Sequence, residues 1–319
     1  MAIPSTLKPA EVAVALIGSA VLKHRTRVDM IFFKAFLAGV MLSFGGLLSE
    51  VLQGGASGLT ASNPGIVKIL GGFVFPVGLV MIVLQGQELL TSNMMIFPMA
   101  LMKRAIPWWS LPLNWLVVTF GNLVGSLFFA AILVKYSGII STAPYDTYVQ
   151  TFAIHKAGDP EWHQIFLRGI GCNWLVSIAI WQATGARDTI SKVWSSRISL
   201  VANMFSVPLG IMFHADLTTA QYIRKSVYAH LTVTQLADLF TYHCFPRRSL
   251  IAAYLGNIVG ALFVALPAVY FYLHDYRADG LVEAEAGEVF PEKGDDVRDD
   301  ITGSSVVRSD RLRMGQRND

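Results

Sequence analysis

The sequence contains few charged residues. Only 15% of its 319 residues are Asp, Glu, Lys or Arg, 53% are hydrophobic, and the mean hydropathy is +0.49. Soluble domains carry about 25% charged residues, so the composition favours a polytopic membrane protein. The formal net charge of +3 is too small to indicate binding to nucleic acid.

Motifs for covalent and metal chemistry are also missing. The two cysteines, Cys172 and Cys244, have neither the spacing of a metal site nor the number needed for a disulfide framework. We find no phosphate-binding loop and no nucleophile motif, and His214, His230 and His243 follow no ligand pattern. The sequence therefore predicts that the protein is not an enzyme and uses no metal or other cofactor.

Long apolar segments account for most of the chain. About 20 apolar residues suffice to cross a bilayer. Segment 66–102 is too long for one straight span, and it contains the polar string QGQELLTS at 85–92. Polar backbone at membrane depth must be buried or line a cavity, so we predict a broken helix there. The expected spans are 30–53, 66–102, 111–134, 165–183, 198–214 and 251–273.

The charges between these segments predict a topology. Residues 1–29 contain Lys23 and other basic residues, and they lack the apolar core of a cleavable signal. The positive-inside rule then places both ends of the chain in the cytoplasm. We expect 1–29 to be a cytoplasmic segment, 30–274 the transmembrane domain, and 275–319 a disordered cytoplasmic tail.

Two strings occur twice. TSNMMIFPMALM at 91–102 reappears as VANMFSVPLGIM at 201–212, and GNLVGSLF at 121–128 reappears as GNIVGALF at 256–263, with six of eight positions identical. The chain is therefore expected to contain two related membrane halves. In transporters and channels such halves meet at a substrate path near the midplane, which broken helices often line.

The two halves differ in two irregular stretches. The first pair of strings is offset by 110 residues and the second by 135, which leaves a surplus around 228–248. Residues 183–200 are polar where their counterparts at 73–90 are apolar. The remaining fifth span, 198–214, is only about 25 Å long at 1.5 Å per residue. We interpret the chain as an aberrant isoform or the product of displaced exon boundaries.

The strings GQELLTS at 86–92 and GIGCNWLV at 169–176, together with the repeated glycine strings, resemble the formate/nitrite transporter family. The resemblance covers about 28–274 outside the irregular stretches, and the tail and loops are similar to fungal nitrite-transporter members. It implies an all-α polytopic membrane protein with six transmembrane helices, arranged as two inverted three-helix repeats. The arrangement is aquaporin-like, and helices 2 and 5 are broken.

The same resemblance implies a homopentamer in the lipid bilayer of the plasma membrane, with a pore in each protomer. Its substrates would be small monovalent anions, formate and/or nitrite, moved together with protons. Ser199 stands where the family usually has a central histidine, and Lys156 resembles a lysine at the pore entrance. The residues that match the family's pore positions are Phe75, Leu79, Leu89, Leu90, Thr91, Ser92, Lys156, Asn173, Ser199 and Asn257.

Each of these residues also has a simpler interpretation. Thr91 and Ser92 could serve merely as caps of a half-helix. Asn173 could serve merely to bond neighbouring helices, and Lys156 could be a solvated loop residue. We expect Glu88 to bond the loop backbone or a neighbouring helix, and the repeated glycines to permit close packing. Two other functions stay open: a non-conducting truncated isoform in hetero-oligomers, and a neutral-solute channel. The paired Asn-Pro-Ala loops of aquaporins are absent.

Overall fold

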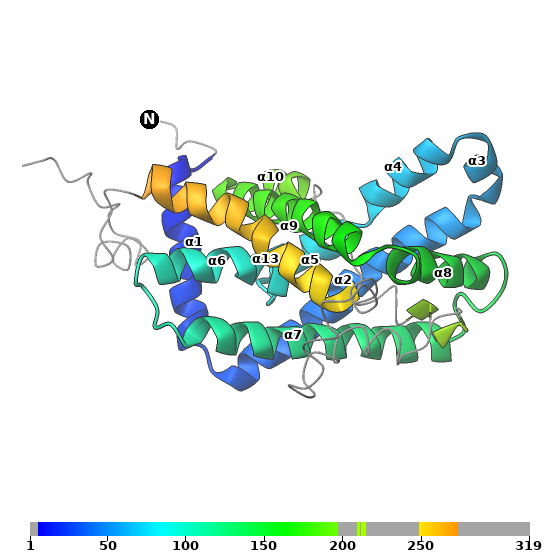
Figure 1. The fold of residues 1–319 in the computed structure, drawn as a ribbon, viewed down its shortest axis with the longest axis horizontal. Helices are drawn as coiled ribbons and strands as arrows, with labels where there is room; N and C mark the ends of the chain where they lie inside the picture. Colours follow the sequence, from blue (N-terminus) through cyan, green and yellow to red (C-terminus); the bar gives the residue numbers. More distant parts are fainter. Residues whose placement is uncertain (1–5, 197–208, 211, 215–248, 274–319) are drawn as a thin grey trace, which may run out of the picture.

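The structure is a computed structural model that describes residues 6–196, 209–210, 212–214 and 249–273. Within these ranges the chain is helical, and its extended pairing is limited to an isolated bridge between Thr6 and Ala186. The long helices lie side by side in a bundle (Figure 1). They are α2 (Val28–Gly55), α7 (Ser110–Phe128) continued by η1 (Phe129–Tyr136), α9 (Trp162–Gly185), and α13 (Ser249–Pro267) continued by η6 (Ala268–Tyr272).

Five helical segments in the described part of the chain are long and apolar enough to cross a membrane: Val28–Gly55, Pro64–Gln85, Ser110–Tyr136, Trp162–Gly185 and Ile251–Tyr272. Each lies over one of the predicted spans, so helices are confirmed at these five places. The predicted span 198–214 lies almost entirely outside the described residues, and the irregular stretch 228–248 lies wholly outside them.

The predicted break in the second span is confirmed. Helix α5 (Val77–Gln85) is followed by Gly86, whose φ of 62° is left-handed, and α6 (Leu90–Met102) begins four residues after this glycine. Glycine adopts this conformation without the steric cost that other residues incur. Upstream, α4 (Pro64–Val74) and α5 are separated by a turn at Phe75–Pro76. Together α4 and α5 form the segment Pro64–Gln85, which has 22 residues and is long enough to cross a membrane without α6.

The helix pairs α2–α7 and α9–α13 pack in the same way. A Cβ atom on Gly125 would overlap the carbonyl oxygen of Phe36, and one on Gly260 would overlap that of Ile170. Gly121 and Gly256 likewise meet the carbonyls of Phe32 and Phe166. The predicted packing role of the repeated glycines is confirmed, and positions in α2 correspond to positions in α9 with an offset of 134 residues.

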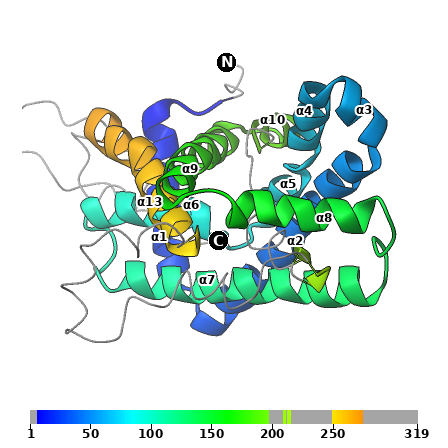
Figure 2. The ribbon, with the colours of Figure 1, turned by 45° about the vertical axis from the view of Figure 1, so that its right-hand side comes forward.

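The N-terminal segment forms a helix that packs against the other helices. Helix α1 (Pro9–Arg25) buries an apolar face that includes Val12, Leu16 and Ile17. It runs across the direction of α6 and α7 (Figure 1 and Figure 2), and it contacts α6, α9 and η6. Hence this segment belongs to the packed domain and carries Lys23 into it.

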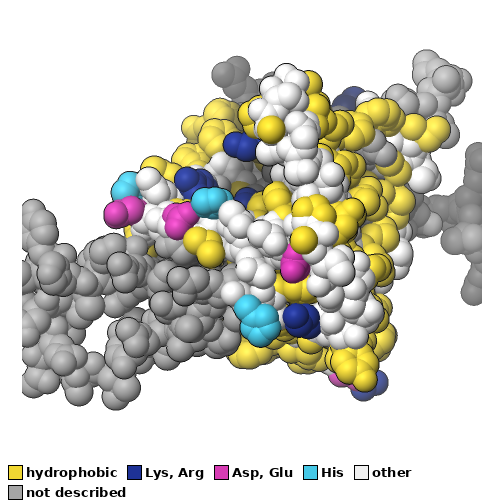
Figure 3. Space-filling view, turned by 90° about the vertical axis from the view of Figure 1, so that its right-hand side faces the viewer, with side chains coloured by type: hydrophobic (Ala, Val, Ile, Leu, Met, Phe, Trp, Pro, Cys, Tyr) yellow, Lys and Arg dark blue, Asp and Glu magenta, His cyan; other side chains and the backbone are white. Residues whose placement is uncertain are grey.

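Short helices connect the spans. They are α3 (Ser57–Ser62) before α4, α8 (Tyr145–Ala153) continued by η2 (Ile154–Gly158) before α9, and α10 (Thr189–Ser195) after α9. Figure 3 views the end of the molecule near α3 and α8, where basic, acidic and histidine side chains lie between hydrophobic flanks. This distribution of side chains fits an end of the molecule that extends from the membrane into water.

Candidate functional site at the helix break

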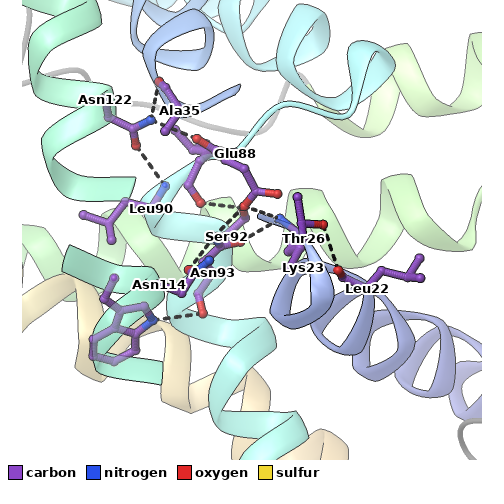
Figure 4. Close-up of polar contacts among 12 residues, drawn as sticks. Leu22, Lys23, Thr26, Ala35, Glu88, Leu90, Ser92, Asn93, Asn114 and Asn122 are labelled. Atoms are coloured by element: carbon purple, nitrogen blue, oxygen red, sulfur yellow. Dashed lines mark hydrogen bonds and ion pairs between the residues drawn. The ribbon is translucent and has the colours of Figure 1, made fainter. Parts of the chain in front are cut away.

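The break between α5 and α6 is held by the side chain of Asn122 on α7. Its Nδ2 donates to the carbonyl oxygens of Glu88 and Ala35, both at 2.8 Å, and its Oδ1 accepts from the amide of Leu90 at 3.0 Å. Figure 4 shows these bonds converging on the loop. One buried carboxamide thus satisfies backbone groups on both sides of the break and ties them to α2.

A charged network lies beside this carboxamide. Lys23 Nζ on α1 is 2.9 Å from Glu88 Oε2 and 2.8 Å from Asn93 Oδ1. Asn93 Nδ2 donates at 2.9 Å to both Glu88 Oε2 and Asn114 Oδ1 (Figure 4). The prediction that Glu88 bonds a neighbouring helix is confirmed, since its partner comes from α1.

The network keeps the break electrically neutral. The side chain of Glu88 is 4% exposed and that of Lys23 is 16% exposed, so water screens this pair only slightly. A buried charge is tolerated when it is paired and its remaining hydrogen-bonding atoms are satisfied. Lys23 and Asn93 both donate to Oε2 of Glu88, so the carboxylate does not present an uncompensated negative charge to the break.

The first turn of α6 is not capped by a side chain from the loop or from α6 itself. Its N-cap residue is Leu89, and Ser92 Oγ donates to the carbonyl oxygen of Leu89 at 2.8 Å. The interpretation of Thr91 and Ser92 as helix caps is therefore wrong for this structure. The positive end of the α6 dipole faces the break, where the amide of Leu90 bonds Asn122.

The side chain of Asn173 connects Thr91 on α6 with Asn257 on α13. Asn173 Nδ2 on α9 donates to the carbonyl oxygen of Asn257 on α13 at 2.7 Å and to that of Thr91 at 3.2 Å. Asn173 is fully buried at 0% exposure. The structure thus brings three predicted site residues together and shows Asn173 in interhelical bonding, while pore lining stays a prediction.

The four predicted apolar constriction residues are all buried. Phe75 lies at the turn between α4 and α5, and Leu79 lies on α5. Leu79, Leu89 and Leu90 belong to one hydrophobic cluster around the break. These contacts establish packing, and the constriction role remains a prediction. Ser199 lies outside the described residues.

Lys156 belongs to a different part of the molecule. It lies in η2, half-buried, with its Nζ 5.2 Å from the ring centroid of Phe152. Burial lowers the pKa of Lys156; nearby Cys172 raises it, Arg168 lowers it and Glu50 raises it. The net direction is downward. Lys156 is thus neither a fully solvated loop lysine nor a member of the network at the break.

Sequence reasoning missed most of the network at the break. Asn122 could have been found, because it occupies the second position of GNLVGSLF, as Asn257 does in GNIVGALF. Lys23 gave no such signal: its basic neighbours assigned it to a cytoplasmic segment. Asn93 and Asn114 lie 21 residues apart on different helices, and no local pattern relates them.

These features define a class: an integral membrane protein, helical in the part that the structure describes, with a broken span in whose loop Lys23 neutralises the buried carboxylate of Glu88. The model of the formate/nitrite transporter family matches residues 10–272. The chain is 34% identical over 293 residues to a probable formate transporter of Methanothermobacter thermautotrophicus, covering 84% of this chain and 97% of that protein. It is also 30% identical over 298 residues to an uncharacterised transporter of Saccharomyces cerevisiae, covering 92% of this chain and 45% of that one.

The fold agrees with these relatives. A pentameric formate channel with formate bound superposes with a TM-score of 0.53 at 24% identity, covering 77% of this chain and 98% of that chain. The chain therefore belongs to the formate/nitrite transporter family, and the similarity to its yeast relative fits a fungal member. Members of this family are membrane transporters and channels.

Proposed function

We propose that the protein moves formate and/or nitrite across the plasma membrane together with protons. The observation that carries the proposal is the broken span, where Asn173 Nδ2 donates to the carbonyl oxygens of Thr91 and Asn257. Its relatives and structural neighbours include formate transporters and a formate channel. We further propose a homopentamer with a pore in each protomer, both termini in the cytoplasm, and 275–319 as a solvated tail.

Such a pore must bind a small anion weakly while the anion passes through surroundings of low dielectric constant. A small anion loses hydration when it enters, and the positive end of a half-helix compensates part of this loss. At the break, Glu88 could oppose an anion, but Lys23 neutralises it at 2.9 Å. The apolar side chains Phe75, Leu79, Leu89 and Leu90 would then exclude hydrated ions.

Lys156 is proposed to act before the constriction. A cation in a funnel raises the local concentration of anions, and an ammonium whose pKa is lowered gives up its proton more readily. Burial lowers the pKa of Lys156. The residue can therefore attract a formate or nitrite ion and favour its protonation near the entrance.

The test is uptake of formate and of nitrite into proteoliposomes that contain the purified full chain, at pH 5.5 and pH 7.5. Saturable uptake that increases in acid is the expected result, with protein-free liposomes as the baseline. Uptake of neither anion by a correctly assembled oligomer would contradict the proposal and favour the non-conducting isoform. Equal uptake of glycerol and the anions would instead favour a neutral-solute channel.

A further inference from the structure

A group of basic and tryptophan side chains lies on the surface at one end of the bundle. Arg25 is the last residue of α1, and Arg104, Trp108 and Trp109 belong to the connection between α6 and α7. The ring of His24 packs edge-on against Trp109, with 5.1 Å between the ring centroids, so α1 contacts this connection (Figure 1). Arg25, Arg104, Trp108 and Trp109 are called the basic-aromatic patch below. The network at the break uses none of them.

The two arginines of the patch carry uncompensated charge in the described part of the chain. Both are exposed, and neither forms an ion pair with any carboxylate that the structure describes. Asp29, the carboxylate nearest to Arg25 in sequence, is already paired with Arg27 at 2.7 Å. The patch is therefore suited to a negatively charged partner.

Arg104 occupies a backbone position that glycine would fill at a lower cost. Its φ is 57°, and it follows the last turn of α6. Its amide donates to the carbonyl oxygen of Leu101, and the amide of Ala105 donates to that of Ala100, both at 2.9 Å. These two bonds form the Schellman arrangement, whose left-handed residue is usually glycine. Other residues are strained there, and such strain is concentrated at ligand sites. The side chain, rather than the backbone, accounts for an arginine at this position.

The position of the patch relative to the spans places it at the membrane surface. Helix α1 runs across the direction of α6 and α7 at this end of the bundle (Figure 1 and Figure 2). Trp108 is 73% exposed and Trp109 is 47% exposed, and the apolar span that contains α7 begins at the next residue, Ser110. Tryptophan favours the boundary between hydrocarbon and water. The patch therefore borders the hydrocarbon at the depth of the lipid headgroups.

We propose that the basic-aromatic patch binds the phosphodiester group of an anionic phospholipid. A guanidinium donates two parallel hydrogen bonds to a phosphate, and the tryptophan rings pack against the glycerol and the first acyl carbons. Phosphatidylglycerol leaves its phosphate charge to the arginines, whereas phosphatidylcholine carries an ammonium of its own. With both termini in the cytoplasm, as proposed above, this lipid belongs to the cytoplasmic leaflet.

The site is tested by thermal unfolding of the purified oligomer of the full chain, in detergent, at increasing concentrations of phosphatidylglycerol. A lipid that binds the folded state raises Tm, so a larger rise than with phosphatidylcholine is expected. Arg104→Gly and Arg25→Gln should each raise the half-saturating concentration of phosphatidylglycerol about fivefold, the effect of one basic residue at an anionic surface. Lys68→Gln removes one exposed charge from α4 and should leave it unchanged. An unchanged value in both patch variants overturns the proposal.

A second measurement separates lipid binding from a structural role of Arg104. Without added lipid, Arg104→Gly should unfold at the wild-type Tm or above it, because glycine adopts this φ freely. Arg104→Lys keeps a positive charge, so it should respond to phosphatidylglycerol more strongly than Arg104→Gly. A lower Tm of Arg104→Gly without lipid, together with an unchanged response to phosphatidylglycerol, would show that the guanidinium bonds another part of the chain and overturn its role in the site.

Soluble phosphates distinguish a lipid from a free anion. Inorganic phosphate and glycerol 3-phosphate share the phosphate chemistry of the headgroup but lack the acyl chains, so they are expected to raise Tm far less than phosphatidylglycerol at equal concentration. An equal rise with inorganic phosphate would overturn the lipid proposal and assign the patch to a soluble anion. None of these measurements requires uptake, so their outcome is independent of the proposed transport of formate or nitrite.

Discussion

Breaking the Lys23–Glu88 pair should destabilise the whole domain. Lys23→Met leaves the Glu88 carboxylate buried, at 4% side-chain exposure, with only Asn93 to compensate it. Removing one partner of a buried ion pair costs about 3–5 kcal/mol, largely because the other charge stays behind. For a domain of this size, 3 kcal/mol corresponds to a Tm lower by about 6–12 °C.

A double-mutant cycle isolates the interaction energy between Lys23 and Glu88 from the effects of each substitution on other residues. Glu88→Gln removes the acidic charge and keeps groups that can bond Asn93, so Lys23→Met/Glu88→Gln contains no buried unpaired charge. The Tm of each variant is measured in detergent at one pH, and the double variant is expected to be more stable than Lys23→Met alone. Destabilisation in the double variant equal to the sum of the two singles would refute the coupling.

An exposed pair on the same part of the chain provides the control. Arg27 and Asp29 are 2.7 Å apart, but their side chains are 81% and 60% exposed. Surface ion pairs contribute little because water and salt screen them. Arg27→Gln should therefore leave Tm unchanged under conditions in which Lys23→Met lowers it, and an equal loss in both would mean that burial does not set the effect.

Three further substitutions test other contacts. Burial lowers the pKa of Lys156, so this residue can give up a proton more readily than an ordinary lysine. Lys156→Arg keeps the positive charge but holds its proton, and we expect it to reduce acid-stimulated uptake; uptake equal to that of the wild type would exclude proton donation by Lys156. Asn122→Leu leaves the backbone amide of Leu90 unpaired at the break. It should lower the free energy of unfolding by about 1–3 kcal/mol for each buried group left unpaired. A lower Tm and faster hydrogen exchange at the break are the expected results. Gly260→Leu places side-chain atoms against a carbonyl of α9, so we expect it to prevent folding and assembly of the oligomer. A Cβ atom on Gly58 has nothing within 4 Å, so Gly58→Leu should assemble normally. Gel filtration of the two variants checks this difference.

The apolar spans and the break could be predicted because their signals are local. A run of about 20 apolar residues has few alternatives to crossing a bilayer, and QGQELLTS at 85–92 is too polar to continue such a run. The packing of Gly125 and Gly260 was also predictable, because the two strings repeat. Each of these inferences needs only a short stretch of sequence.

The partners of the break could not be predicted, because they are brought together from distant helices. Lys23 and Glu88 are 65 residues apart, and Asn173 and Asn257 are 84 apart. A basic residue before a span has a ready explanation in the positive-inside rule, and this explanation concealed the buried role of Lys23. The use of a single carboxamide, Asn122, to hold both sides of the break follows only from the packing of α2 against α7.

The position of Lys23 on α1 has a consequence for biosynthesis. Placing a lone carboxylate such as Glu88 within the bilayer costs about 2.5–3.5 kcal/mol during insertion. Its counter-charge lies on a helix that leaves the ribosome earlier, so the compensating cation already exists when Glu88 arrives. A bulky tag or a deletion at α1 would therefore impair membrane insertion of α5 and α6, which lie more than 50 residues downstream.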